Sequence, residues 1–169
     1  HLHVLRDYVH FPLDDRKLQN RFQARLQQIV REELAEETDG LQQAIAGYLE
    51  KVVMAMEWPI SLSGGEYALP LLKTLKCQPV LDGKEPLERL MQYLDLYHTL
   101  LKDQCFVLVG ARAYFSSEEM EGFHAMAHYK KWRVLLLEQH RPTPLPGESY
   151  CLLDDTLCEL RLDFPPDFR

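Results

Sequence analysis

Carboxylate side chains stand where predicted β-strands end, and carboxylates in that position can bind a divalent metal ion. Glu138 follows the apolar run Val134–Leu137, and Asp154, Asp155 and Glu159 stand near the ends of two shorter strand patterns. Ligands of open α/β sheets bind at the carboxyl ends of the strands, and hard cations prefer oxygen ligands. The pattern therefore admits a metal-dependent nuclease that uses Glu138 and Asp154, although strand ends are also acidic simply because they reach solvent.

Histidines and cysteines give weaker signals. His124 and His128 are four residues apart on a predicted helix, a spacing that can chelate a metal, but no third ligand accompanies them. Cys105 and Cys158 have no histidine and acid partners in a recognisable order, so a thiol nucleophile is not favoured. The four cysteines lack C-x-x-C spacing, and we expect them to be reduced and mostly buried.

A phosphate-binding loop of the Walker A type is absent from this sequence. That loop needs G-x-x-x-x-G-K-[ST], whose backbone amides and lysine hold the phosphates. The glycine pair Gly64–Gly65 is followed by Glu66 and lies between predicted helices. Nucleotide chemistry by that route is therefore excluded.

A stripe of basic residues is a candidate for binding a polyanion. Lys17, Arg21 and Arg25 recur every four residues on a predicted helix, which spaces their charges about 6 Å apart along its axis. That interval is close to the phosphate spacing of one DNA strand. A solvated helix face, partly neutralised by Glu32 and Glu33, explains the same residues, and from these residues alone it is the simpler explanation.

Composition indicates a folded, acidic protein with an uneven charge distribution. The chain has 169 residues, 46% of them hydrophobic, and a net charge of −7. Residues 1–31 carry +3 and the remainder −10, which is compatible with one positive face on an acidic body. No apolar run approaches the roughly 18 residues of a membrane span, and no secretion signal is recognisable. We therefore expect a cytoplasmic protein.

Hydrophobic periodicity predicts helices in the first half of the chain and a βαβ pattern in the second half. Helices are predicted over residues 16–37, 41–56, 66–75, 85–101 and 116–131, and strands over 2–5, 77–81, 105–111, 132–139, 150–155 and 158–162. Asp14 or Asp15 should cap the first helix, and Ser116 or Ser117 the last. The strand–helix–strand order favours an α/β fold with a mostly parallel sheet.

Several of these segments together resemble a known protein family. The stretch CFVLVGARAYFSSEEMEGFHAMAHYKKWRVLLLEQH, followed by LLDDTLCEL, resembles the Csn-two family, the CRISPR-associated spacer-acquisition proteins of type II-A systems. The matching features are the buried strand at Val107–Val109, Tyr114 with the helix start Ser116–Glu119, the strand Val134–Glu138 and the closing element Asp154–Glu159. The start LHVLRDYVHFPLDDRKLQNRF also resembles the family's strand, turn and first leg helix.

The resemblance implies an architecture and a function. It implies a RecA-like or P-loop-kinase-like α/β head formed by residues 1–15 and 77–169, and an extended helical leg formed by residues 16–76. It also implies a ring-shaped homotetramer that binds double-stranded DNA ends in spacer acquisition, without enzymatic activity. The partners would be the type II-A effector nuclease and integrase proteins, in adaptive antiviral defence.

The resemblance shifts the interpretation of individual residues. It favours Lys17, Arg21 and Arg25 as phosphate contacts, with Lys73 and Lys76 as weaker additions. Glu138 and Asp154–Asp155 then become strand-end residues of a scaffold. Two alternatives stay open, namely a protein-interaction scaffold of the adaptation complex that does not bind DNA, and a divalent-metal-dependent nuclease.

The sequence departs from the family pattern at two places. The family has a further amino-terminal segment with the first strands of the head sheet, and since this chain starts at His1 we expect a truncated piece. The family also has an acidic calcium-binding cluster at the hinge between head and leg. Only Glu57 and Glu66 remain of it here, whereas calcium takes about six to eight oxygen ligands.

Overall fold

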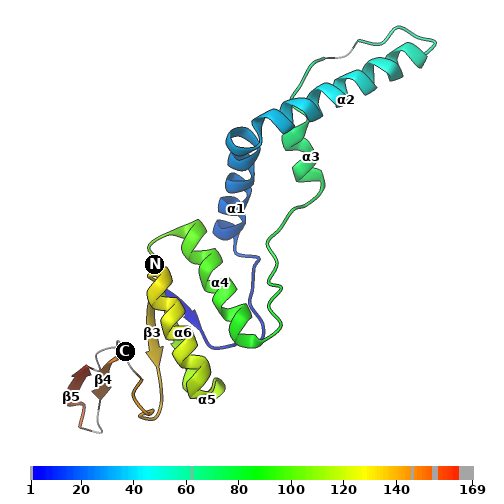
Figure 1. Cartoon of the computed structure of the whole chain (residues 1–169). Coiled ribbons are helices and arrows are strands. Elements are labelled where there is room, and N and C mark those ends of the chain that lie inside the picture. The colour runs from blue at the N-terminus through cyan, green and yellow to red at the C-terminus, as the bar shows by residue number, and fades with distance from the viewer. Residues whose placement is uncertain (1, 62, 146, 154–155, 164–169) are drawn as a thin grey trace. The chain divides into compact units, whose positions relative to one another are not determined.

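The computed structural model describes residues 2–61, 63–145, 147–153 and 156–163, and about half of the chain is helical (Figure 1). The chain divides into two compact units, residues 1–12 with 81–169 and residues 13–80. The first unit is mixed α/β, which agrees with the predicted class, and the second is helical.

A small parallel sheet forms the centre of the α/β unit. Strands β1 (Leu2–Leu5), β2 (Cys105–Val109) and β3 (Arg133–Leu137) lie in the order β1-β2-β3, and both pairs are parallel. The predicted βαβ arrangement is therefore confirmed. Three strands do not define a RecA-like strand order, so that part of the predicted fold stays a prediction.

Two long helices belong to the same unit as the sheet. The His3 ring on β1 contacts α4 (Pro86–Leu101), with its Nε2 2.9 Å from the Tyr93 hydroxyl and its ring centroid 4.6 Å from that of Tyr97. Helix α6 (Ser117–Lys130) lies beside α4, and Lys130 forms an ion pair with Asp95 at 3.0 Å (Figure 1). Fully buried aromatic and aliphatic side chains form the core, among them Leu90, Tyr93, Leu94, Phe106, Leu108, Met120 and Phe123.

The helix starts follow the capping rules. The Asp15 carboxylate accepts a hydrogen bond from the Leu18 amide at 2.8 Å and begins α1 (Arg16–Gln28). Ser116 and Glu119 form a reciprocal capping box at the start of α6. Both predicted caps are therefore confirmed, and in each case the structure selects one of the two candidate residues.

The sequence predicted the two short strands after β3, whereas periodicity did not reveal a short helix after β2. A short helix, α5 (Ala111–Tyr114), follows β2 after Gly110, whose φ of 71° is the left-handed conformation that glycine adopts without strain. Strands β4 (Ser149–Leu153) and β5 (Glu159–Asp163) form an antiparallel hairpin that is separate from the parallel sheet.

The helical unit differs from the prediction at its first break. Helix α1 continues into a π-helical turn, η1 (Ile29–Glu33), and α2 (Ala35–Ala55) begins after Leu34. The break predicted at residues 37–41 is wrong, because α2 runs through these residues. The chain instead turns at Leu34, where the Leu34 amide donates to the Ile29 carbonyl and the Thr38 hydroxyl donates to the Val30 carbonyl at 3.0 Å. Helix α3 (Ala68–Thr74) follows, and the strand predicted over residues 77–81 does not form.

Replacing Gly83 with alanine should destabilise the α/β unit. The Gly83 amide donates a hydrogen bond to Gln92 Oε1 at 3.1 Å, and a Cβ atom there would lie 2.9 Å from the Arg89 backbone nitrogen. The backbone must therefore shift, and we expect a loss of about 1–3 kcal/mol in the free energy of unfolding. Urea denaturation measures this change.

Gly122→Ala is the matched control. Gly122 lies within α6 with no atom within 4 Å of an added Cβ, so this change should stabilise the helix by about 0.5–1 kcal/mol. Equal effects of the two substitutions would contradict the close approach at Gly83.

Candidate functional site

The basic stripe lies on α1 and is exposed. Lys17 and Arg21 form no ion pair within the residues that the structure describes, whereas the Arg25 guanidinium lies 2.7 Å from Glu33 Oε1 and 3.2 Å from Gln28 Oε1. The predicted neutralisation by acidic residues therefore affects one position of the stripe. Lys17 and Arg21 remain available to an anionic partner.

Lys73 and Lys76 come from a different segment of the helical unit than this stripe. Lys73 is in the last turn of α3, and Lys76 follows that helix with a φ of 49°. The Gln23 side chain donates to the Cys77 carbonyl at 2.9 Å. Gln23 lies about 200° around α1 from Arg21, so the segment that carries Lys76 runs along the opposite side of this helix. A role of Lys73 and Lys76 in DNA binding stays a prediction.

The residues expected to bind calcium do not form a cluster. Glu57 and Glu66 are both exposed, and Glu66 Oε2 lies 3.9 Å from an Arg31 guanidinium nitrogen. Within residues 2–61, 63–145, 147–153 and 156–163, no group of three or more His, Cys, Asp or Glu side chains is placed to hold a metal. A calcium ion at Glu57 and Glu66 stays a prediction.

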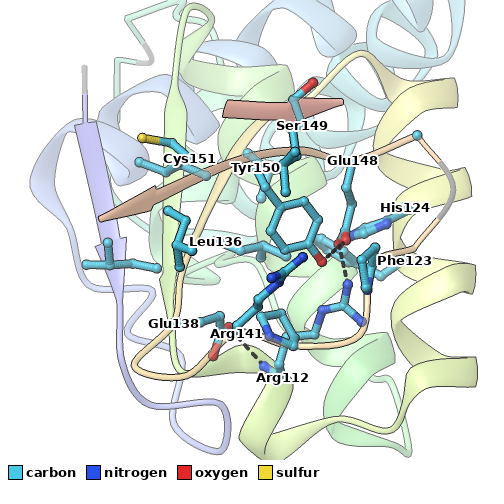
Figure 2. A pocket seen from close by; sticks show the side chains of 18 of the residues that line it. Arg112, Phe123, His124, Leu136, Glu138, Arg141, Glu148, Ser149, Tyr150 and Cys151 are labelled. Carbon is cyan, nitrogen blue, oxygen red and sulfur yellow. Dashed lines mark hydrogen bonds and ion pairs between the residues drawn. The ribbon is translucent and has the colours of Figure 1, made fainter. Parts of the chain in front are cut away.

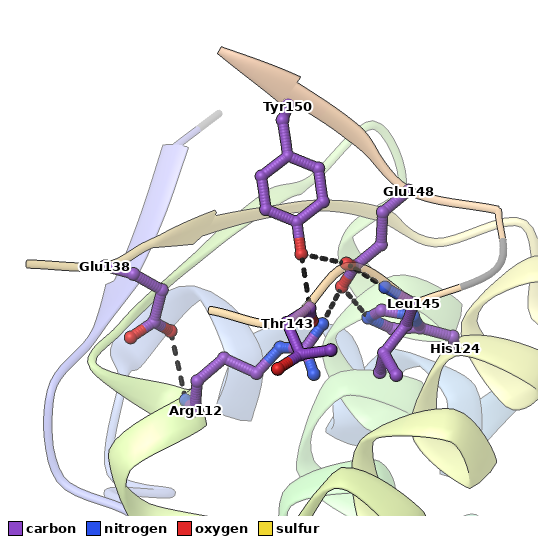
Figure 3. Close-up of polar contacts among 7 residues, drawn as sticks. All are labelled: Arg112, His124, Glu138, Thr143, Leu145, Glu148 and Tyr150. Carbon is purple, nitrogen blue, oxygen red and sulfur yellow. Dashed lines mark hydrogen bonds and ion pairs between the residues drawn. The ribbon is translucent and has the colours of Figure 1, made fainter. Parts of the chain in front are cut away.

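A largely buried polar cluster lies beyond the carboxyl ends of β2 and β3 (Figure 3). We call it the Glu148 cluster: Glu148, Arg112, His124 and Tyr150. One Glu148 oxygen bonds the Arg112 guanidinium and lies 3.1 Å from His124 Nε2. The other accepts from the Tyr150 hydroxyl and from the Leu145 amide at 3.0 Å. Three hydrogen-bond donors and the His124 imidazole therefore surround one carboxylate.

Burial controls the electrostatics of this cluster. The Arg112 and Glu148 side chains are only 8% and 11% exposed. Burial lowers the pKa of His124 below its ordinary value of 6.5, while Glu148 opposes this shift and Arg112 adds to it. Burial, followed by the hydrogen bond to Glu148, raises the pKa of Tyr150 to about 12. Tyr150 is therefore a neutral donor to the carboxylate at neutral pH, and the adjacent His124 imidazole is neutral as well.

Glu138 has a structural partner. Its Oε1 accepts a hydrogen bond from the Arg112 amide at 3.0 Å, in the first turn of α5 (Figure 3). Among the other residues of the nuclease hypothesis, Glu159 forms an ion pair with Arg161, and Asp154 and Asp155 lie outside the described residues. Glu138 therefore joins the end of β3 to α5.

The histidine and cysteine candidates are dispersed. His124 is bound to Glu148, while His128 is exposed. None of the four cysteines forms a disulfide. Cys77 and Cys105 are half-buried and Cys151 and Cys158 are exposed, so the expectation that most are buried is wrong.

Sequence reasoning missed Arg112, Glu148 and Tyr150. Arg112 lies in a helix of four residues, which is too short to show periodicity. Glu148 lies at the end of the proline-rich loop after β3, a composition that is typical of an exposed connection. Their pairing joins positions 36 residues apart, and no local spacing encodes such a contact.

Removing the Glu148 carboxylate should destabilise the protein strongly. Glu148→Ala leaves the Arg112 charge buried without its partner, and the loss of one member of a buried pair costs about 3–5 kcal/mol. Urea denaturation tests this, with Glu121→Gln on the exposed face of α6 as a control that should change stability by about 0.5 kcal/mol or less. A loss below about 1 kcal/mol in Glu148→Ala would contradict the burial of this pair.

His124 should make folding sensitive to acid. Its pKa is lower in the folded state than in the unfolded chain, so its contribution is complete above about pH 6.5 and is lost as the pH falls through the folded pKa. His124→Gln keeps a polar side chain beside Glu148 but cannot titrate. Denaturation at about pH 7.5 and about pH 5 should therefore show a smaller acid-induced loss in this variant than in the parent.

His128→Gln is the matched control for this experiment. His128 lies one turn further along α6 and is exposed, so its variant should keep the acid sensitivity of the parent. If His124→Gln and the parent lost stability equally on acidification, His124 would not be the group responsible.

Comparisons with known proteins agree with the resemblance in the sequence. The family described as CRISPR-associated protein (Cas_Csn2) matches residues 1–156. No curated protein matches the chain. Within the described residues, each helix falls short of the length or the apolar character that crossing a bilayer requires. Since the family match covers most of the 169 residues, the chain belongs to the Cas_Csn2 family of CRISPR-associated proteins.

Proposed function

We propose that this CRISPR-associated protein binds the ends of linear double-stranded DNA during spacer acquisition, as a ring-shaped homotetramer without catalytic activity. The observation that carries the proposal is the pair of exposed cations on α1, Lys17 and Arg21, one turn apart and without an intramolecular ion pair among the described residues. The type II-A effector nuclease and the integrase proteins are the proposed protein partners.

Phosphate contacts explain how an acidic protein can bind DNA. The net charge of −7 disfavours binding to an average surface, but charge density at the contact decides affinity. Several copies of α1 around one hole would place their basic stripes on a common inner surface. Binding through phosphates alone would be independent of sequence and would weaken steeply with salt.

Exposed apolar side chains on α2 support self-association. This helix has 21 residues and none of them is buried within the single chain. Leu41, Tyr48 and Val52, at helical spacing, are 42%, 65% and 38% exposed, and Met56 directly after the helix is 47% exposed. Exposed apolar patches of this kind mark contacts between proteins. A scaffold that contacts other adaptation proteins would use the same surface, so DNA binding must be measured directly.

The absence of catalysis is part of the proposal. Glu138 follows β3, and Glu148 lies beyond the carboxyl ends of the parallel strands, where a catalytic group of an α/β protein would lie. Each already accepts hydrogen bonds from protein donors, from the Arg112 amide for Glu138 and from Arg112, Leu145 and Tyr150 for Glu148. We therefore expect no DNA cleavage in Mg²⁺ or Mn²⁺, and no dependence of DNA binding on Glu138.

Reversing the two unpaired charges of the stripe should weaken DNA binding strongly. We expect Lys17→Glu combined with Arg21→Glu to remove two phosphate contacts for each bound stripe. The slope of log affinity against log salt should then fall by about 1.8 for each stripe that contacts the duplex, because each phosphate contact contributes about 0.9. Mobility shifts of linear and closed-circular duplexes at several salt concentrations measure this, on protein whose oligomer mass is determined in parallel.

Two single variants control the measurement. Arg25→Glu should weaken binding less than the double variant, since Arg25 is already paired with Glu33, and Lys51→Glu makes the same charge change on α2. Lys51→Glu should leave the binding of linear DNA nearly unchanged. Retention of parental affinity and salt dependence by the double variant would show that the stripe does not contact DNA. Binding of closed-circular DNA as tightly as linear DNA would contradict threading from an end.

A further inference from the structure

The helical unit is held together by fewer buried contacts than the α/β unit. In the α/β unit, all four residues of the Glu148 cluster line one cavity of about 780 Å³ (Figure 2). In the helical unit, the only buried side chains among the described residues are Leu18, Ala68 and Leu69. None of them belongs to η1 or α2. The bend between α1 and α2 is therefore not fixed by a hydrophobic core.

The bend follows from a local change in backbone hydrogen bonding. The Leu34 amide donates to the Ile29 carbonyl at 2.9 Å, five residues back, and α2 leaves α1 at an angle beyond this turn (Figure 1). Sharp kinks in helices arise at proline, at glycine and serine pairs, or at π-helical turns. Residues 25–38 contain no proline, glycine or serine. The π-helical turn is therefore the cause of the bend.

The Thr38 side chain holds the bent form. Its hydroxyl donates to the Val30 carbonyl at 3.0 Å, eight residues back. In a straight α-helix two residues with this separation lie about 12 Å apart along the axis, which a threonine hydroxyl cannot span. The Val30 carbonyl needs this donor, because the Leu34 amide that would bond it in an α-helix bonds Ile29 instead. This hydrogen bond therefore exists only in the bent form.

Arg25 makes a second contact across the bend. Its guanidinium lies 2.7 Å from Glu33 Oε1, which joins the last turn of α1 to the last residue of η1. The two side chains are 46% and 51% exposed, so the pair is weak and a competing anion can replace Glu33. Arg25 is also a member of the basic stripe. A phosphate that binds Arg25 therefore removes one of the contacts that hold the bend.

The local sequence favours a straight helix through the same residues. Positions 31–37 read REELAEE, and each of these residue types is a strong helix former. Straightening gives the Leu34 amide its ordinary partner four residues back and breaks the Thr38 hydrogen bond. Arg31 lies 3.9 Å from Glu66, an exposed pair of small energy. Because no side chain of η1 or α2 is buried within the single chain, the bent and straight forms are close in free energy.

We propose that residues 29–34 form a two-state hinge, bent when Thr38 bonds Val30 and straight, as one α-helix from Arg16 to Ala55, when that bond opens. A phosphate contact at Arg25 shifts the hinge toward the straight form. The hinge itself does not depend on DNA, whereas its coupling to DNA rests on the proposed function. Because such coupling is reciprocal, a substitution that frees Arg25 from Glu33 also raises the affinity for a duplex.

The test measures a distance across the hinge in the full chain. Spin labels are attached to non-natural amino acids at Asn20 and Gln43, which are exposed on α1 and α2. A straight helix separates these positions by about 35 Å along its axis, and the bent form by less. In double electron–electron resonance, Thr38→Val should raise the ratio of the longer to the shorter distance about two- to tenfold, the effect of one hydrogen bond.

Thr74→Val is the matched control. The Thr74 hydroxyl donates to the Pro70 carbonyl at 3.0 Å, four residues back within α3, so its loss should leave the distance across the hinge unchanged. Glu33→Gln should also add the longer distance, with a smaller effect than Thr38→Val, because it removes only an exposed ion pair. If neither Thr38→Val nor Glu33→Gln adds a longer distance, the hinge is overturned.

Two further measurements test the coupling to DNA. Glu33→Gln should bind a linear duplex about two- to fivefold more tightly than Glu32→Gln, which removes the same charge one residue away and leaves Arg25 paired. In the parent, addition of the duplex should increase the longer distance. Equal affinities of the two variants, or an unchanged distance in the bound parent, would overturn the coupling but not the hinge. A parent that binds no duplex would overturn the proposed function and the coupling together, and the distances in Thr38→Val would still decide on the hinge.

Discussion

The carboxylate of Glu148 is the interaction on which the second half of the α/β unit depends. It joins Arg112 of α5, His124 of α6, the Leu145 amide and Tyr150 of β4. Desolvating a charge is costly, and only a full set of donors compensates that cost. The buried carboxylate is therefore stable only when all of these partners contact it together. This requirement fixes the position of the loop before β4.

The sheet carries a second constraint, because parallel sheets are normally buried on both faces. His3 and Phe106 share a face that contacts the aromatic residues of α4, whereas Leu2, Val4, Leu135 and Leu137 on the other face are 47–68% exposed. Val107 at the centre of that face is 6% exposed, since neighbouring strands shield it from both sides. Strand pairing alone thus protects the middle of the sheet, and the exposed area is concentrated at its edges.

The sequence predicted those elements whose signals are local. Helices α4 and α6, strands β2 and β3 and the caps at Asp15 and Ser116 follow from periodicity and from side chains that bond their own helix. The break near Gly40 was predicted wrongly, because turn-forming residue types have a weak effect within a helix of 21 residues. The Glu148 cluster was not predictable, since its members are brought together only by the completed fold.

The effect of each charged residue on DNA binding depends on its distance from the bound phosphates. At physiological ionic strength the Debye length is about 8 Å, so acidic residues farther than that from α1 are largely screened from an approaching phosphate. Glu33 lies within this distance and is held 2.7 Å from Arg25, which removes one cation of the stripe. Lys17 and Arg21 have no such partner within the described residues and keep their full charge. The local cations on α1 therefore influence DNA binding more than the net charge of −7 does. Each further copy of the stripe that faces the same duplex would release more counterions and so raise the affinity.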